Sequence, residues 1–522
     1  MSMDATSLPN DPALLKQLVT QQDATIDQQV STIDSLTSKL AQLEHYIAQL
    51  VRARFGPRSE KLDPNQLALF EAAVEEAAKS VAPVVETQVE THVRRGGGRS
   101  GLPADLPRER IEHDLSEQEK HCPGCGQVRQ RIGSETSEQL DYIPAQLKVI
   151  EHIRWKYACR ACQEHVAIAA PAAKPIDRGL PGPGLLAQVA VGKFSDHLPL
   201  YRLEDIFARA GMELSRSTLC RWARHTADLL EPLYALMVER VRRSHVIHTD
   251  DTPVPVLDPT LGHTRTGRFW VYCGDRDNPY SVYDYTPSRK RDGPVTFLAK
   301  YQSYLQADAF AGYDGIYAAG SVKQVLCWAH ARRKFFEAKE TRPREAHEAL
   351  AWIARLYEIE REAKSALCEE RRAQRQARAL PLLTEFRAWL LSLTGRVLPK
   401  SPFGQAVHYV LPRWEGFVRY CEDGALAIDN NLSERTLRPC AIGRKNWLFL
   451  GNDRGGRTAA ILLSFMASCK ANQVEPWAYI RDMITELAKQ PRGVTPPSPL
   501  LASLLPDAWL ATHPEDYRPW SR

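Results

Sequence analysis

Apolar residues recur every seven positions near the start of the chain. Ile26, Ile33, Leu40 and Ile47 mark one row, and Leu36, Leu43 and Leu50 lie three places after the last three of them. The two rows form the a/d stripe of a coiled coil, with polar residues on either side. One amphipathic helix lying on its own domain is the alternative, but the narrow stripe favours pairing between chains. We therefore predict a coiled-coil oligomerisation helix over 1–56 and a homo-oligomer.

The heptad pattern is absent from 57–110. An acidic stretch rich in alanine and valine is followed by arginines and glycines between Arg94 and Arg99. Because consecutive glycines destabilise helices and strands, we predict a flexible linker. Its basic end can reach a phosphate backbone, although a solvated linker is the favoured interpretation.

Helical spacing returns over 181–240. We predict helices over 185–194 and 201–210, and a third helix that begins after Ser215, a favourable N-cap residue. Two helices joined by a glycine turn are typical of helix-turn-helix domains, although many such hairpins bind nothing. Ser217, Arg221 and Arg224 share one side of the third helix, and we predict that this region binds DNA through them.

Strand-like alternation begins near residue 244. Strands are predicted over 246–256, 268–273, 280–285, 303–308 and 323–328, with helices over 294–301 and 313–319. This order is that of a ribonuclease-H-like fold, in which the first and fourth strands lie side by side.

The rest of the chain completes a multidomain α+β protein. The ribonuclease-H-like α/β catalytic domain has its first part over 241–340 and its second part over 423–490. Helical spacing over 341–422 predicts a helical insertion between the two parts. The proline-rich residues 491–522 are predicted to form a C-terminal tail.

Composition narrows the class of protein. The 522 residues are 43% hydrophobic and 25% charged, which is typical of soluble globular proteins and excludes collagen-like and wholly disordered chains. No stretch approaches the roughly 18 apolar residues of a membrane-spanning helix, and the polar residues 1–11 predict no secretory signal. Seven of the 11 cysteines occur singly, as in reduced proteins of the cytoplasm, which is the predicted location.

The other four cysteines form two pairs, each with two residues between its members. They are Cys122, Cys125, Cys159 and Cys162. Two such pairs supply the four sulfur ligands of a structural Zn²⁺ site, so we predict a zinc-ribbon-like module over 111–180. The strand-like residues 146–157 suit a hairpin between the two pairs. A redox pair and a coincidence are the alternatives.

Two acidic residues end predicted strands that lie side by side. Asp250 ends the β-branched run in the first strand, and Asp308 ends the fourth strand. Carboxylates in one cleft repel each other unless a cation lies between them. Oxygen ligands of this kind favour Mg²⁺, which stabilises phosphoryl transfer. Asp251 is the alternative to Asp250, because adjacent residues of a strand face opposite sides. Ordinary solvated strand ends are the other interpretation.

A third acidic group follows the helical insertion. Asp429 is predicted to cap a helix whose one face carries Asn430, Asn431 and Glu434. Arg435, Arg438 and Lys445 add positive charge along the same segment, and we predict that they contact DNA.

Several motifs carry a resemblance to a known family. They are His248-Thr-Asp-Asp-Thr-Pro-Val-Pro-Val256, Leu305-Gln-Ala-Asp-Ala-Phe-Ala-Gly-Tyr-Asp314, Cys327-Trp-Ala-His-Ala-Arg-Arg-Lys-Phe335, Asp429-Asn-Asn-Leu-Ser-Glu-Arg435, Ala441-Ile-Gly-Arg-Lys-Asn-Trp447 and Glu475-Pro-Trp-Ala-Tyr-Ile480. The chain resembles the DDE transposases of bacterial insertion-sequence family sixty-six. The resemblance implies that Asp250, Asp308 and Glu434 form the catalytic triad and hold Mg²⁺. It also implies terminal repeats and target DNA as partners, together with accessory transposition proteins.

The predicted function is therefore a DNA transposase. It would cleave the ends of an insertion sequence and join the 3′ ends to target DNA by Mg²⁺-dependent phosphoryl transfer. A DNA-binding structural or regulatory protein with an inactive catalytic domain is the alternative, and a standalone Mg²⁺ nuclease is a further one.

Overall fold

The computed structural model describes residues 16, 21–32, 127, 146–157, 167–177, 179–258, 260–491 and 493–520. The chain divides into two compact units, and one of them is Pro64–His152. The fold below belongs to the other unit. Residues 21–32 are helical and exposed, whereas most of the predicted coiled coil, the predicted linker and the four paired cysteines lie outside the described residues.

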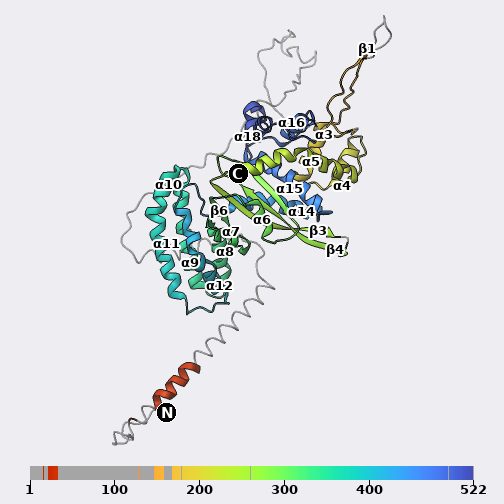
Figure 1. The fold of residues 1–522 in the computed structure, drawn as a ribbon. Helices are drawn as coiled ribbons and strands as arrows, with labels where there is room; N and C mark the ends of the chain where they lie inside the picture. The colour runs from red at the N-terminus through yellow and green to blue at the C-terminus, as the bar shows by residue number, and fades with distance from the viewer. Residues whose placement is uncertain are drawn as a thin grey trace. The chain divides into compact units, whose positions relative to one another are not determined.

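A five-stranded mixed sheet is the centre of the fold (Figure 1). Its strands are β3 (Val246–Asp258), β4 (His263–Cys273), β5 (Ser281–Thr286), β6 (Tyr304–Ala307) and β7 (Lys323–Leu326). The spatial order is β5-β4-β3-β6-β7. The first three strands form an antiparallel meander, and β6 and β7 run parallel to β3. The first and fourth strands of this sheet are thus neighbours, as the sequence predicted.

Short helices follow the last three strands. They are α6 (Asp292–Phe297), α7 (Asp314–Ala318) and α8 (Trp328–Glu337), which follow β5, β6 and β7 respectively. A parallel pair of strands needs such a crossover, because its two strands begin at the same end of the sheet.

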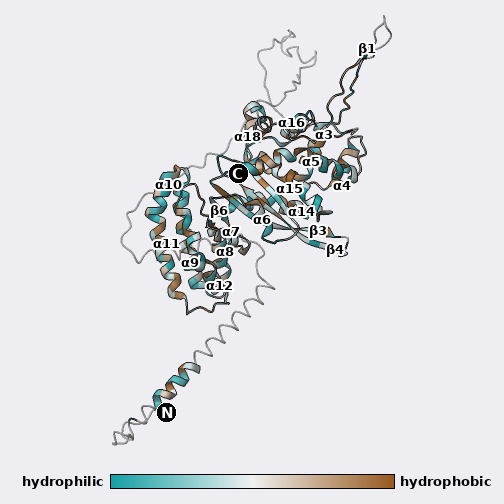
Figure 2. Ribbon diagram, in the orientation of Figure 1, coloured by the Kyte–Doolittle hydropathy of each residue, from teal (hydrophilic) through white to brown (hydrophobic). Residues whose placement is uncertain are grey.

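Helices that precede and follow the strands in the sequence share the core of the sheet. They are α3 (Pro183–Phe194), α4 (Leu200–Arg209), α5 (Arg216–Val241), α15 (Asp453–Ala471) and α16 (Pro476–Ala488). Two of them, α5 and α15, contact β5 directly. Figure 2 shows hydrophobic residues along α5 and α15. The predicted helix-turn-helix is present in outline, with Ser215 as N-cap and Gly211 at a φ of 89°. These helices belong to the same hydrophobic core as the sheet and form no separate core.

The exposed edge of β5 is sealed by helix α15. The backbone N–H groups of Tyr283 and Ser281 donate to the hydroxyls of Ser464 and Ser468, at 2.8 and 3.1 Å. These two serines lie four residues apart and therefore on one face of the helix. Because an open strand edge invites pairing with another chain, this contact protects the sheet.

Residues 343–421 form the helical insertion that the sequence predicted (Figure 1). Its main helices are α9 (Pro343–Glu362), α10 (Cys368–Gln374), α11 (Leu380–Leu393), α12 (Pro402–Val410) and α13 (Trp414–Val418). One π-helical turn, Arg375–Ala379, joins α10 to α11. The insertion contacts the β7 edge of the sheet through α13.

One expectation for the remaining segments was wrong. Residues 146–155 form no strand, and only Lys156–Tyr157 pairs, with Ala167–Ile168, so the short antiparallel contact flanks the second cysteine pair instead of joining the two pairs.

The predicted C-terminal tail is folded over most of its length. Helices α17 (Ser498–Ser503) and α18 (Pro506–Thr512) bury Leu501 and Trp509 against the core. Proline content was a poor guide here, because proline at the first positions of a helix is favourable. Among the described residues, no helix has the length and apolar character needed to cross a bilayer.

Candidate active site

Asp250 and Asp251 face opposite sides of β3, and their partners differ. The Asp251 side chain is 3% exposed and accepts from Arg268 Nη1 at 2.7 Å and Arg289 Nη2 at 2.8 Å. The Asp250 carboxylate accepts the backbone N–H of Asp251 at 2.7 Å, and no arginine or lysine pairs with it among the described residues. Asp251 is therefore neutralised by the protein, whereas Asp250 is available to an added cation.

The sheet register brings Asp250 and Asp308 together. Strands β3 and β6 pair in parallel, with His248 beside Gln306. Asp250 and Asp308 lie two residues further along their strands, on the same face as that pair. Asp308 directly follows β6, and its carboxylate accepts the N–H of Phe310 at 3.1 Å.

Burial and like charges disfavour ionisation of this site. Burial raises the pKa of Asp250 to about 7, and the nearby carboxylates of Asp308, Asp251 and Glu434 act in the same direction. Burial also raises the pKa of Asp308, while the charge of His330 opposes that shift. The carboxylates of Asp308, Asp251 and Glu434 are therefore all close enough to act on the charge of Asp250.

Glu434 is placed by the short segment that leads into α14 (Asn431–Trp447). Asn430 is fully buried; its amide donates to Thr249 O at 2.8 Å, its side-chain oxygen lies 3.2 Å from His248 Nδ1, and its backbone N–H donates to Cys327 Sγ at 3.1 Å. The side chain of Asn430 thus ties the start of α14 to β3, and its backbone N–H ties it to the residue before α8. Glu434 lies in the first turn of α14, so the contacts that fix the start of this helix also fix Glu434.

Two further contacts fix the same segment. Gln306, buried in β6, donates to Ala427 O at 2.6 Å and to Asp429 O at 2.9 Å. The Asp429 carboxylate accepts the backbone N–H of Asn431 at 3.2 Å and the hydroxyl of Tyr357 at 3.1 Å. Asp429 therefore supports the start of the helix as predicted, although the N-cap position belongs to Asn430.

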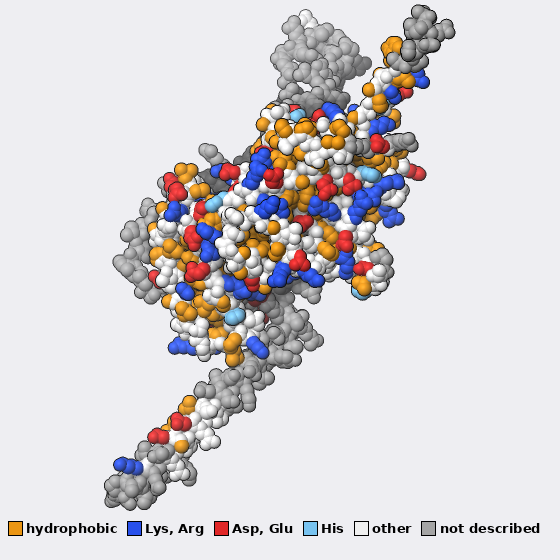
Figure 3. Space-filling view, in the orientation of Figure 1, with side chains coloured by type: hydrophobic (Ala, Val, Ile, Leu, Met, Phe, Trp, Pro, Cys, Tyr) orange, Lys and Arg blue, Asp and Glu red, His pale blue; other side chains and the backbone are white. Residues whose placement is uncertain are grey.

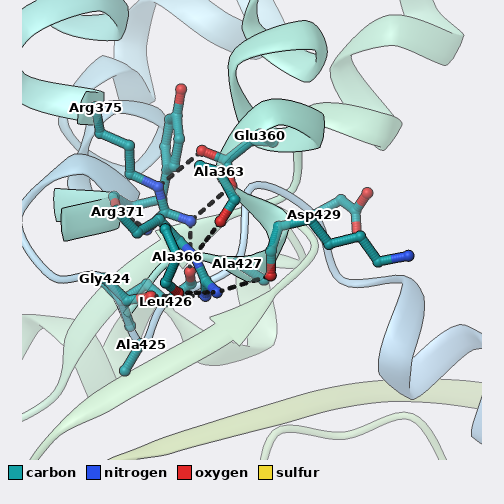
Figure 4. A network of polar contacts seen from close by, with 12 residues as sticks. Glu360, Ala363, Ala366, Arg371, Arg375, Gly424, Ala425, Leu426, Ala427 and Asp429 are labelled. Carbon is teal, nitrogen blue, oxygen red and sulfur yellow. Dashed lines mark hydrogen bonds and ion pairs between the residues drawn. The ribbon is translucent and has the colours of Figure 1, made fainter. Parts of the chain in front are cut away.

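The helical insertion fixes the backbone segment that precedes Glu434. Arg375 is 1% exposed and forms a two-fold ion pair with Glu360, with both nitrogen–oxygen distances at 2.7 Å. Its guanidinium also donates to the carbonyls of Tyr420, Asp423 and Leu426, at 2.8–2.9 Å. Figure 4 shows Arg375 and Glu360 pointing toward each other, with Arg371 close by and bonded to Gly424 O. The insertion thereby anchors the backbone shortly before Asp429.

His330 is a neighbour of the triad that sequence reasoning did not assign to the site. Its Nδ1 lies 3.5 Å from Glu434 Oε1, and a ring nitrogen, Cys327 Sγ and a Glu434 oxygen lie within 4.8 Å of one another. The sequence places His330 in the first turn of the helix that follows β7. Only the fold shows that this turn lies beside Glu434.

The donor set fits a hard divalent cation. Asp250, Asp308 and Glu434 supply carboxylate oxygens, which are the ligands that Mg²⁺ prefers. Cys327 is a softer donor, but burial raises the pKa of its thiol to about 12 and keeps it protonated. Of the three carboxylates, Glu434 also belongs to the cluster with Cys327 and His330, whose ligand atoms lie within 4.8 Å of one another.

The six predicted DNA-binding residues differ in their exposure. Arg435 and Arg438 are exposed on α14 near Glu434, and Lys445 is exposed further along the same helix. Ser217 and Arg221 are exposed at the start of α5, and Arg221 lines a pocket of about 930 Å³ between α4 and α5. Arg224 is partly buried, with its Nε shielded from solvent, so it is less accessible than the prediction assumed.

Figure 3 shows lysine and arginine side chains, mixed with acidic ones, over α4 and the start of α5. The exposed cations there include Arg202, Arg209, Arg216 and Arg221. Arg216 is paired with Glu204 at 3.4 Å, so part of this charge is already balanced.

Three family models match parts of this chain. Residues 178–458, which contain the carboxylate site, match the model of the transposase IS66 family. Residues 119–163 match the zinc-finger binding domain of transposase IS66, and residues 42–111 match the model described as transposase C of IS166 homeodomain. The chain belongs to the IS66 family of transposases, as the sequence motifs predicted.

Two relatives come from Sinorhizobium fredii (strain NBRC 101917 / NGR234). Uncharacterized protein y4hP is 34% identical over 494 residues, which cover 88% of this chain and 87% of that protein. Uncharacterized protein y4jD is 34% identical over 424 residues, which cover 78% of this chain and 82% of that protein.

The zinc-finger match includes all four paired cysteines, Cys122, Cys125, Cys159 and Cys162, and supports zinc binding. The homeodomain match covers the whole segment, 57–110, that composition alone suggested was a linker.

Proposed function

We propose that this protein is a DNA transposase that cleaves the ends of its insertion sequence and joins the 3′ ends to target DNA. The observation that carries the proposal is the coupled group of Asp250, Asp308 and Glu434, which lacks an arginine or lysine partner among the described residues. The mixed sheet with the order β5-β4-β3-β6-β7 supports a ribonuclease-H-like fold for the domain that holds this group.

The chemistry of the proposed reaction follows from this group. Mg²⁺ bound by the three carboxylates would supply Lewis-acid stabilisation of the attacking and leaving oxygens in phosphoryl transfer. The protein positions its ligands in advance: β3 and β6 present the two aspartates, and the Asn430 and Arg375 contacts present Glu434. Preorganised ligands reduce the reorganisation needed during the reaction.

The other segments have proposed roles in binding DNA and in assembly. The helix-turn-helix residues Ser217, Arg221 and Arg224, the zinc module, and Arg435, Arg438 and Lys445 would hold the terminal repeats and target DNA. The coiled coil over 1–56 would pair protomers so that two ends are held together. Accessory transposition proteins remain expected partners from the resemblance.

The test is a cleavage and strand-transfer assay on the ends of the element with Mg²⁺, with and without accessory proteins. Asp250→Asn, Asp308→Asn and Glu434→Gln should each abolish both reactions while DNA binding is kept. Asp314→Asn, an equivalent change at an exposed aspartate of α7, is the matched control and should retain activity. Retained strand transfer in Glu434→Gln would remove that residue from the triad.

The same assay separates the alternative functions. Binding of the ends without cleavage, in the presence of accessory proteins, would favour a regulatory DNA-binding protein. Cleavage without joining would favour a nuclease.

A further inference from the structure

A pocket of about 290 Å³ lies directly beside Glu434. Residues of α8, including His330 and Arg332, form one wall. Tyr357 of α9, and Asn431 and Glu434 of α14, complete the lining. The helical insertion therefore contributes to a cavity that opens next to the carboxylate site.

Two helix N-termini meet at this pocket. His330 lies in the first turn of α8, and Asn431 and Glu434 lie in the first turn of α14. The backbone N–H of Trp328 donates to Ile428 O at 3.1 Å, which holds the two helix starts together. The N-terminus of a helix carries a partial positive charge, so both helix starts add positive potential to the pocket, although the carboxylate of Asp429 already accepts the N–H of Asn431.

Arg332 provides a full positive charge in the same pocket. No carboxylate lies within ion-pair distance of Arg332 in the described part of the chain, whereas the adjacent Arg333 pairs with Glu337 at 3.3 Å. Arg332 and Tyr357 both line the pocket, so the arginine lies across it from the helical insertion. An arginine that faces a pocket without a carboxylate partner is a typical phosphate ligand.

We propose that this pocket binds a phosphodiester group of the DNA strand, next to the phosphate that reacts, with Arg332 as its main ligand. This inference rests on the proposed function, because the strand must reach the carboxylate site. The pocket lies at the lower end of the size range for small-ligand sites, which suits one nucleotide unit. Arg332 would then fix the register of the strand relative to Glu434.

The test is a double-mutant cycle between protein and DNA. Single phosphates around the cleaved bond are replaced by neutral methylphosphonates, and affinity is measured in Ca²⁺ for the wild type and for Arg332→Ala and Arg332→Gln. One methylphosphonate should weaken wild-type binding about tenfold but leave the Arg332 variants almost unchanged, because the same contact is already lost. The slope of the logarithm of the binding constant against the logarithm of the salt concentration should become shallower by about one in both variants, because one phosphate contact is lost.

Arg387→Ala is the matched control, because Arg387 is an exposed arginine of α11 outside the pocket lining. It should show independent, additive losses at every phosphate. Additive losses at every position with both Arg332 variants would overturn the pocket proposal. Binding in Ca²⁺ does not require cleavage, so a coupled phosphate in a protein that fails to cut would retain the pocket and reject the transposase activity.

Discussion

The two adjacent aspartates of β3 have different roles: Asp251 forms ion pairs within the protein, and Asp250 is the proposed metal ligand. Asp251 is buried between two arginines, whereas Asp250 is surrounded by other carboxylates. Sequence reasoning reached this assignment through the family motif, and alternation along a strand required that only one of the pair face the site. It could not assign the two arginines, because Arg268 and Arg289 reach Asp251 only through the fold.

Asp250→Asn should stabilise the metal-free protein at pH 8. The pKa of Asp250 is about 7 in the folded protein, above its ordinary value of 3.8, so the folded state binds the proton more tightly than the unfolded state does. Stability that depends on this proton is present at low pH and is lost as pH rises through about 7. Removing the charge should therefore recover on the order of 1–3 kcal/mol at pH 8, measured by urea unfolding in EDTA.

Asp251→Asn is the contrasting variant. It leaves Arg268 and Arg289, which are 19% and 42% exposed, without their carboxylate. Because solvent reaches both arginines, the loss of these charged hydrogen bonds should cost about 1–3 kcal/mol. Equal effects of the two substitutions on the unfolding free energy would contradict the different environments described for Asp250 and Asp251.

At the scale of elements, the segment before Glu434 is held by the insertion through Arg375. Arg375→Met should destabilise the protein by about 3–5 kcal/mol, because it leaves Glu360 buried without its partner. It should also raise the Mg²⁺ concentration needed for cleavage, since Glu434 loses part of its support. Chemical unfolding and a Mg²⁺ titration of the cleavage rate measure the two effects.

Arg378→Ala is the control for this prediction, because the nearby pair of Arg378 and Glu362 is about half exposed. An exposed pair of this kind contributes about 0–1 kcal/mol. Arg375→Lys should restore stability only in part, because lysine cannot reproduce the two-fold contact. A normal Mg²⁺ requirement in a folded Arg375→Met variant would show that the insertion does not position Glu434.

The serines of α15 make a second prediction at this scale. Ser464→Ala leaves the buried N–H of Tyr283 without an acceptor and should cost about 1–3 kcal/mol of unfolding free energy. Ser392→Ala on α11, whose exposed hydroxyl bonds only its own helix, should change stability by less than about 0.5 kcal/mol. Similar losses in the two variants would argue against the role of α15 as the cover of the β5 edge.

Strands and helices with a regular spacing of apolar residues could be predicted from the sequence. The contacts that position the site could not, because they join residues far apart in the chain. Alternation located all five strands of the sheet, and helical spacing located the insertion. The contacts of Asn430 and Arg375 join residues far apart in sequence, so no local pattern indicates them. Helices α17 and α18 were not predicted, because the proline-rich composition of 491–522 does not indicate whether that segment is ordered.

At the scale of the whole molecule, the helix-turn-helix and the sheet share one hydrophobic core. Composition divided them at residue 240, but α5 continues from the predicted DNA-binding end to Val241, directly before β3. Movement of the DNA-binding end relative to the carboxylate site is therefore limited by packing, and separate expression of 181–240 should yield an unfolded peptide by circular dichroism. A folded, DNA-binding fragment would contradict this account.

The most direct test of the carboxylate site is anomalous diffraction from crystals of the DNA complex soaked in Mn²⁺. The account predicts Mn²⁺ between Asp250, Asp308 and Glu434, with oxygen ligands from all three residues at about 2.0–2.2 Å and none from Asp251. Mn²⁺ absent from this position, or bound without both Asp308 and Glu434, would contradict the proposal that these three carboxylates share the catalytic ions.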